Sequence, residues 1–171
     1  MYDDLWKLKM LIKGLILLWY CHIALGYDAG SPWKNPSTFC VLDIRSNVTC
    51  WGGEGTGGKV PSNATNKGAV AQLASSADAV SALHTNGTVS TWGAITDSSI
   101  PDSLANVNML ASTGSAFAAT YTDSKDGLIH VAVWGSISFG GDLGEQDPTG
   151  VEMVYGNFGS PNPMPLPQPQ P

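Results

Sequence analysis

Along most of this chain, hydrophobic and polar positions alternate in short runs, and the runs themselves repeat. Three segments that end in Trp-Gly carry the same alternation around a turn: Phe39–Gly52, Val80–Gly93 and Phe117–Gly135. Their tryptophans are separated by 41 and 42 residues. Because alternation with a period of two is typical of a half-buried strand, each segment predicts an antiparallel hairpin.

The turns of these hairpins are marked in the sequence. Asn86-Gly87 and Asp126-Gly127 are dipeptides typical of tight turns, because both positions tolerate a positive φ. The flanking residues are mostly Val, Thr, Ile and Ala, which suit a half-buried pleat. The third segment has five extra residues, which we place near its turn.

A second block precedes each of the later two hairpins. Val70–Leu83 aligns with Val107–Thr120. The stretch Ala69–Ala82 is rich in alanine and suits a helix on propensity alone. We predict a strand there instead, because its counterpart carries Gly114 and β-favouring neighbours. A fourth copy of the block begins at Val151.

A repeat of about 41 residues, each a small antiparallel unit with a tryptophan, indicates stacked units. The sequence therefore predicts an all-β protein, built as a partial β-propeller or as an open stack of blades. One blade cannot bury both of its faces, so aromatic and aliphatic side chains are expected to fill the space between neighbours. The predicted repeat core is Phe39, Trp51, Leu73, Trp92, Leu110, Phe117 and Trp134.

The N-terminal segment differs from the repeats. Three lysines precede Gly14–Leu25, an uncharged and mostly apolar run of 12 residues. This length suits the hydrophobic region of a secretory signal peptide and is short for a membrane span of about 20 residues. We predict that residues 1–26 form a hydrophobic signal helix cleaved before Tyr27. The alternatives are an uncleaved signal anchor and a buried helix.

Three cysteines are present, and cleavage would leave the pair Cys40 and Cys50. In the repeat frame the pair flanks a hairpin turn, where facing strands bring Cβ atoms about 4.5–5.5 Å apart. We predict a disulfide, which an exported protein can form, against the alternative of two buried thiols. Sequons for N-glycosylation, which predict a glycoprotein, begin at Asn47, Asn63 and Asn86.

The remaining segments are assigned by composition. Every second residue from Pro161 to Pro171 is proline, which is typical of an extended linker, stalk or disordered end. We predict four regions: a signal peptide or anchor at 1–26, a linker at 27–38, the β repeat module at 39–158 and a proline-rich tail at 159–171.

Composition narrows the classes of function. Only 13% of residues are charged and 20 of 171 are glycine, which favours strands and turns over a helical bundle. The net charge of −6 argues against nucleic-acid binding, which needs a basic face. Membrane contact is expected only through residues 1–26, where these are not cleaved.

Candidate catalytic and metal-binding residues are few after residue 26. His84 and His130 fall beside hairpin turns in different repeats, where we expect them to be exposed. Neither pairs with a nucleophile in the pattern, so we predict no enzymatic activity. The loop with Asp142, Glu145 and Asp147 offers oxygen ligands for Ca²⁺, but its spacing does not match a calcium-binding loop. We predict a solvated acidic loop, no metal and no cofactor.

Three motifs keep their phase over residues 39–158: an aliphatic residue before Ala-Ser, then Asn-Gly or Asp-Gly, then Val-x-x-Trp-Gly. In these motifs the chain resembles the repeats of the regulator of chromosome condensation family. Its short period and Val-Pro step are similar to the secreted β-lactamase inhibitory proteins of that fold. The resemblance implies a β-propeller, seven-bladed in typical members, that binds proteins at one end of its ring.

Two departures limit what the resemblance carries over. The family's Gly-His pair before the hairpin reads Asp78-Ala79 and Ser115-Ala116 here. Three units and part of a fourth do not close a seven-bladed ring. The chain is therefore expected to assemble with other copies, to form a short open stack, or to be an incomplete product. Guanine-nucleotide exchange is not expected.

Together these patterns predict a secreted or surface-tethered, non-enzymatic module that contacts an unknown protein or glycan through its loops. The predicted location is secreted or extracellular. One alternative is a structural segment of a coat or adhesin that self-associates through open blade edges. Another is a truncated repeat protein without independent activity. The alternative location is anchored in a membrane, with the module facing the lumen or the outside.

Overall fold

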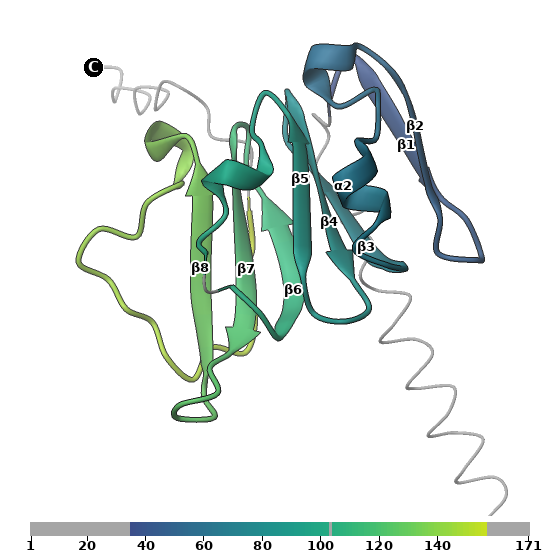
Figure 1. Cartoon of the computed structure of the whole chain (residues 1–171). Coiled ribbons are helices and arrows are strands. Elements are labelled where there is room, and N and C mark those ends of the chain that lie inside the picture. Colours follow the sequence, from purple (N-terminus) through teal and green to yellow (C-terminus); the bar gives the residue numbers. More distant parts are fainter. Residues whose placement is uncertain (1–34, 103, 157–171) are drawn as a thin grey trace, which may run out of the picture. The chain divides into compact units, whose positions relative to one another are not determined.

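Three small antiparallel sheets, joined in sequence order, form the framework of the computed structural model (Figure 1). The structure describes residues 35–102 and 104–156. The first sheet pairs β1 (Thr38–Leu42) with β2 (Val48–Gly52). The second sheet contains β3 (Val70–Ser75), β4 (Ala79–His84) and β5 (Val89–Gly93), and the third contains β6 (Val107–Ser112), β7 (Ala116–Thr122) and β8 (Ile129–Gly135). The protein is thus mostly β, as the sequence predicts.

Short helical turns connect the strands. They are η1 (Glu54–Thr56), α2 (Ser62–Thr65), η2 (Asp97–Ser99) and η3 (Ile137–Phe139). Among the described residues, no helix has the length and apolar character needed to cross a membrane. The predictions for the signal segment 1–26, for most of the linker and for the proline-rich tail concern residues 1–34 and 157–171, which lie outside the described residues.

The predicted hairpins form, and their strands pair as the repeat frame requires. Facing pairs are Cys40 with Cys50, Val80 with Trp92, and Phe117 with Trp134. Gly87 and Gly127 have φ of +79° and +71°, which confirms tight turns at the two marked dipeptides. The alanine-rich segment forms β3 and β4. Its strand prediction is therefore confirmed over helix propensity.

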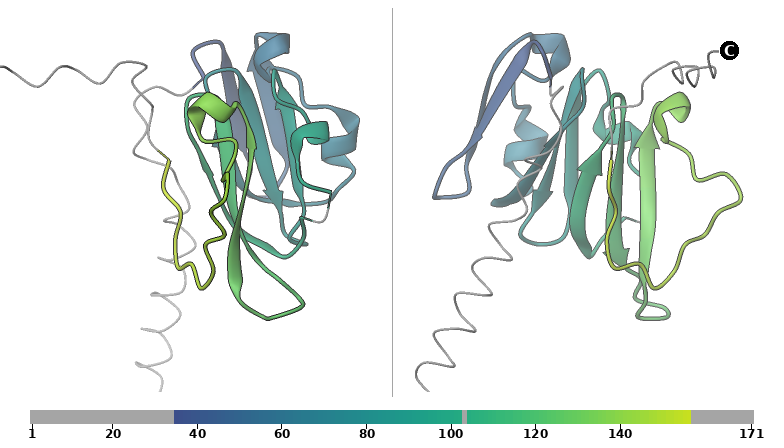
Figure 2. Two further views of the ribbon diagram at one scale, coloured as in Figure 1. Left: turned by 90° about the vertical axis from the view of Figure 1, so that its left-hand side faces the viewer. Right: turned by 180° about the vertical axis from the view of Figure 1, so that it is seen from behind.

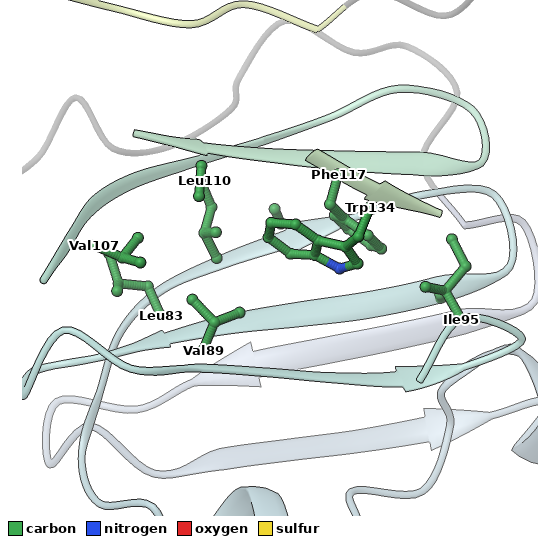
Figure 3. Packing of buried hydrophobic residues seen from close by; sticks show 10 residues of the cluster. Leu83, Val89, Ile95, Val107, Leu110, Phe117 and Trp134 are labelled. Carbon is green, nitrogen blue, oxygen red and sulfur yellow. The ribbon is translucent and has the colours of Figure 1, made fainter. Parts of the chain in front are cut away.

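The three sheets follow one another in chain order (Figure 2). The core lies between neighbouring sheets, and alternation along the second sheet divides it in two. Figure 3 shows the part between the second and third sheets. We call the contact between the first and second sheets the first junction. It contains Val70, Val80, Ala82 and Trp92, packed against Cys40, Leu42, Val48 and Cys50. The second junction lies between the second and third sheets. It contains Leu83, Val89 and Ile95, packed against Val107, Leu110, Phe117, Ala119 and Trp134.

Two residues predicted in the core lie on the surface. Phe39 and Trp51 are 68% and 52% exposed, so the prediction that they are buried is wrong. They point away from the second sheet. Their neighbours Cys40 and Cys50 face that sheet, and successive side chains of a strand point to opposite sides. Among the described residues no sheet covers this face. Trp92, Leu110, Phe117 and Trp134 are buried as predicted, and Leu73 is half-buried against the first junction.

Both histidines are buried, so the prediction of exposed hairpin histidines is wrong. His84 shares a face of β4 with Val80 and Ala82, which point into the first junction. His130 shares a face of β8 with Trp134, which points into the second junction. A position beside a turn does not expose a side chain when its strand face is covered.

The end of the segment assigned as a linker takes part in the fold. Thr38 is the first residue of β1, and its hydroxyl donates to the carbonyl of Gly53 at 3.2 Å. The Asn35 amide donates to the carbonyl of Thr56 at 2.6 Å. Both side chains are buried. These bonds hold the loop after β2 against residues 35–38, at the start of β1.

Candidate binding site

A cleft of about 220 Å³ opens between the first and second sheets, at the end where their hairpins turn. Its buried walls include Ala82, His84 and Trp92. Exposed residues line its mouth, among them Arg45 and Thr65. The cleft therefore combines an apolar interior with a polar and basic rim.

The rim is shaped by a turn that Asp43 organises. The Asp43 carboxylate accepts hydrogen bonds from the backbone N–H of Arg45 at 2.8 Å and of Asn47 at 2.9 Å. The Asn47 amide donates to the same carboxylate at 3.0 Å. The Asn47 side chain is the main cause that lowers the pKa of Asp43, with the two backbone donors adding to it. The turn thereby holds Arg45 at the surface.

His84 ties the cleft wall to the loop before β3. Its Nδ1 lies 3.0 Å from the carbonyl oxygen of Gly68, and its Nε2 lies 2.8 Å from the Ser90 hydroxyl. A carbonyl oxygen only accepts, so Nδ1 carries the proton and Nε2 accepts from Ser90 in the neutral ring. Both ring nitrogens are thus engaged inside the protein.

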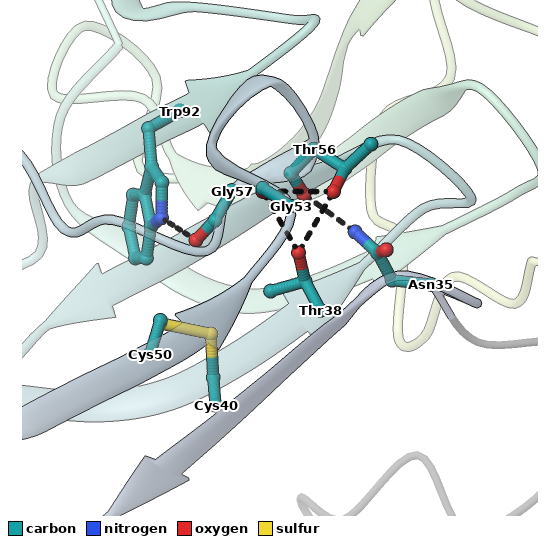
Figure 4. Close-up of a disulfide and its surroundings, with 8 residues drawn as sticks. All are labelled: Asn35, Thr38, Cys40, Cys50, Gly53, Thr56, Gly57 and Trp92. Carbon is teal, nitrogen blue, oxygen red and sulfur yellow. Dashed lines mark hydrogen bonds between the residues drawn. A yellow bond between two sulfur atoms is a disulfide. The ribbon is translucent and has the colours of Figure 1, made fainter.

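Trp92 fixes the first sheet to the second (Figure 4). Its indole Nε1–H donates to the carbonyl of Gly57 at 2.9 Å, in the loop after β2. Its ring belongs to the first junction, against which Cys40 and Cys50 pack. The two cysteines form a disulfide with an S–S distance of 2.02 Å, which confirms the predicted bridge. The cleft is therefore built on a cross-linked hairpin.

All three predicted glycosylation residues are exposed. Asn47 belongs to the rim of the cleft. The Asn63 amide donates to the Asp97 carboxylate at 2.9 Å, and the Asn86 amide donates to the carbonyl of Lys67 at 3.1 Å. The acceptor amides are therefore at the surface, and each is held by a hydrogen bond within the protein.

The acidic residues singled out in the sequence do not gather. Among the described residues, the one group with metal-ligand proximity is Asp123, Asp126 and His130, at the hairpin of the third sheet. Of the loop acids, Asp147 lies nearest, with its Oδ1 3.7 Å from Nδ1 of His130. Asp142 instead accepts from the backbone N–H of Gly144 at 2.8 Å.

His130 and Asp126 form a close pair, with Nε2 and Oδ2 2.9 Å apart. The hydrogen bond that His130 donates to the Asp126 carboxylate is the main cause that raises the pKa of His130. The pKa of Asp126 is lowered, first by the backbone N–H of Leu128 and then by His130. Sequence reasoning missed this pair, because Asp126 was assigned to the turn alone. An Asp four residues before a His, across a tight turn, was the available signal.

No family model matches this sequence, and no curated protein matches it either. Among solved structures, the chain is similar to the ectodomain of the receptor kinase CR4 from Physcomitrella patens, with a TM-score of 0.55 and 17% identity. The match covers 72% of this chain and 35% of the CR4 chain. The chain therefore spans about a third of that ectodomain's length. The likeness concerns the fold of its β units.

Proposed function

We propose that this chain is a secreted or surface-tethered module that binds a protein or a glycan through its loops and has no enzymatic activity. The observation that carries the proposal is the cleft between the first two sheets. Its volume of about 220 Å³ lies below the roughly 300–1,000 Å³ of pockets that enclose a whole small molecule. Such a cleft fits one side chain or one sugar ring of a larger partner.

The extracellular location is supported by three independent features. The hydrophobic N-terminal run has the length of a signal peptide. The disulfide needs an oxidising compartment to persist. The fold is similar to part of a receptor ectodomain. The resemblance of the repeats to the regulator of chromosome condensation family adds a reason to expect protein binding at one end of the stack.

The binding role is favoured over catalysis by the state of the histidines. Both ring nitrogens of His84 have partners within the protein. His130 is paired with Asp126 on the third sheet, on a different element from the cleft. A general base needs a free ring nitrogen within reach of its substrate. The histidine that lines the cleft lacks one.

Arg45 suggests the chemistry that the cleft recognises. It is the basic side chain on the rim, and it is exposed beside an apolar interior. A guanidinium binds carboxylates through two parallel hydrogen bonds. We therefore expect an acidic peptide segment or a glycan with an acidic sugar, with one residue in the cleft and its carboxylate on Arg45.

The test begins with the full chain produced in cells that secrete it. Intact mass gives the mature N-terminus, the disulfide and any glycans. The product is then applied to immobilised oligosaccharides, with and without acidic sugars, and to a panel of extracellular protein domains. Arg45→Glu should weaken binding by about tenfold or more. Lys59→Glu makes the same change of charge in the same unit, outside the cleft, and should leave binding intact.

Equal losses in both variants would attribute binding to general charge and would contradict a role for the cleft. Retention of the chain inside the cell with reduced cysteines would contradict the secreted module itself. Asn47 supplies a further check, since a glycan there would sit on the rim. Enzymatic removal of N-glycans should strengthen binding where Asn47 carries one.

A further inference from the structure

Two loops of this protein fold into the same turn. The first follows β2 at residues 53–58, and the second follows β8 at residues 136–141. In each, three backbone N–H groups donate to carbonyls within the loop at equivalent spacings, at 2.8–3.3 Å in the first and 2.9–3.1 Å in the second. Each holds a glycine with positive φ six residues after its tryptophan, Gly57 at +104° and Gly140 at +92°.

The first loop shows what such a turn binds. The carbonyl of Gly57 accepts the indole N–H of Trp92, which belongs to the next sheet. In the second loop Gly140 occupies the same place and is exposed. No tryptophan of residues 35–102 or 104–156 donates to it. The loop after β8 is thus a preformed acceptor for the tryptophan of a following unit.

A second position in this loop repeats the pattern. Ile95 lies three residues after Trp92 and packs against Trp134 of the following sheet (Figure 3). Ile137 lies three residues after Trp134 and has no following sheet to cover it within the described residues. Ile95 is 9% exposed and Ile137 is 74% exposed. Ile137 therefore offers an apolar surface on which the tryptophan of a following unit could pack.

The segment after this loop begins another unit. The N–H of Val151 donates to the carbonyl of Ile129 at 3.1 Å. Val70 and Val107, the first residues of β3 and β6, make the same bond at 3.0 Å to the hairpin of the preceding unit. Val151 therefore lies where the first strand of a further unit would begin, as β3 and β6 begin at Val70 and Val107, and residues 151–156 themselves form no strand. In the described part of the chain, no hairpin follows to complete their sheet.

Within the described residues, the first sheet has a hairpin but lacks a strand before it, whereas the segment at 151–156 lacks a hairpin after it. The first sheet also presents the exposed face with Phe39, Val41 and Trp51. In the later units the corresponding face packs on the sheet before it. Within residues 35–102 and 104–156, the first sheet thus lacks a strand and a covering loop of the kind that the residues after β8 present.

We propose that a second copy of this chain fills both deficiencies, so that copies associate head to tail. Residues 151–156 of one copy add beside β1 of the next, and Trp51 of that next copy packs on the loop with Ile137 and Gly140. The internal repeats give the register. Leu73 pairs with Ala82 and Leu110 with Ala119, so Val154 of one copy should pair with Val41 of the other.

Charge supports the same orientation. Residues 35–70, at the first end, contain three basic and two acidic side chains. Residues 120–156, at the other end, contain one basic and six acidic side chains. A head-to-tail contact joins the nearly neutral, slightly basic end to the acidic end. A contact between the 120–156 ends of two copies would join acidic to acidic and is disfavoured, whereas a contact between two 35–70 ends gains nothing from charge.

The test is sedimentation of the secreted full chain over a range of concentrations. Wild type should form dimers or larger species, because a head-to-tail contact closes into a ring or continues. Trp51→Glu at one end and Ile137→Glu at the other should each weaken association by about tenfold or more. Both side chains are exposed, so neither variant should unfold. Ile44→Glu changes a fully exposed residue at a hairpin turn and should associate like wild type.

Mixing the two defective variants is the decisive step. Trp51→Glu damages only the end with the first sheet, and Ile137→Glu damages only the end with the loop after β8. Each variant therefore keeps the end that the other lacks, so an equimolar mixture should form a dimer and nothing larger. A face that pairs with itself would not be rescued in this way. Val41→Cys mixed with Val154→Cys should also give a covalent dimer that neither variant gives alone.

Three outcomes would overturn the proposal. One is a wild type that stays monomeric at all concentrations. Another is undiminished association of Trp51→Glu. The last is association without the covalent dimer of the cysteine pair. Trp51→Glu should keep the binding that the cleft supports, because Trp51 does not line the cleft, so failure of this proposal is distinguishable from failure of the cleft as a binding site.

Discussion

The first and third sheets carry the same aromatic pair in opposite surroundings. Phe39 stacks on Trp51 with ring centroids 5.8 Å apart, and Phe117 stacks on Trp134 at 5.7 Å. The angles between the ring planes are 25° and 26°. The first pair is largely exposed, whereas Phe117 and Trp134 are 1% and 2% exposed.

The comparison separates what a hairpin decides from what its neighbour decides. Stacking follows from cross-strand pairing, which each hairpin makes within itself. Burial comes from the sheet before it, which the third sheet has and the first lacks among the described residues. The aromatic pair is therefore a ready-made contact surface, and its energetic value depends on whether another unit covers it.

The largest expected effect tests this difference directly. Trp134→Ala should lower the free energy of unfolding by about 3–5 kcal/mol, because it leaves a cavity in the second junction. Trp51→Ala should lower it by about 1 kcal/mol or less, since it removes only a stacking partner at the surface. Denaturant unfolding followed by circular dichroism, at concentrations where the chain is monomeric, measures both.

Similar losses in the two alanine variants would contradict the comparison. They would mean that the face with Trp51 is covered within a single chain. Trp134→Phe is the matched control, because it keeps an aromatic ring and removes the indole N–H that donates to the Thr91 hydroxyl at 3.2 Å. Its loss should be clearly smaller than that of Trp134→Ala.

The next effect concerns the disulfide, which gives the first sheet a cross-link that the second sheet lacks. At the positions of Cys40 and Cys50 the second sheet has Ser81 and Thr91, whose hydroxyls are 3.0 Å apart. The double variant Cys40→Ser with Cys50→Thr copies that pair. The bridge closes a loop of 10 residues, so its loss should cost about 2–3 kcal/mol.

Thermal unfolding of the double variant, compared with wild type under oxidising and reducing conditions, gives this cost. Reduction should lower the melting temperature of wild type and leave the variant unchanged. An unchanged melting temperature in both would show that the first hairpin is held by the Trp92 contact alone. The carbonyl of Gly57, which accepts from Trp92, is outside the cross-linked loop and should be unaffected.

Local pattern and neighbour contacts also explain how far the sequence predicts this structure. The alternation before each Trp-Gly step specifies strands and their register, so the facing of Cys40 and Cys50 could be predicted. The exposure of Trp51 could not be predicted, because a repeat pattern assigns every copy the same neighbours. The burial of His84 was missed because a residue beside a turn was assumed to be exposed to solvent, whereas the neighbouring sheet covers it.

The cleft was not predictable from any single motif. Its rim comes from the Asp43 turn, and its interior comes from Trp92 on another unit. Residues that lie 47 positions apart meet there only because two sheets pack face to face. A pattern that repeats within a unit contains no information about a space formed between units. Such sites require the structure.

The smallest expected effect is a dependence of stability on pH, which the His130–Asp126 pair gives to the third sheet. The pKa of His130 is raised above its ordinary value of 6.5, chiefly by the hydrogen bond that its ring donates to the Asp126 carboxylate. Its contribution to stability is therefore complete below that value and is lost as the pH rises through the folded-state pKa. The pKa of Asp126 is lowered from 3.8, so its contribution is retained above 3.8 and is lost as the pH falls through the folded-state pKa.

The pair should therefore stabilise the third sheet most at mildly acidic pH. We expect wild type to melt at a higher temperature at pH 5.5 than at pH 8, relative to His130→Gln measured at both. Asp147→Asn should reduce this difference only slightly, because Asp147 lies 3.7 Å from the ring and is a lesser cause of the shift. A pH dependence that persists in His130→Gln would place its origin elsewhere and would remove this distinction between the two ends of the protein.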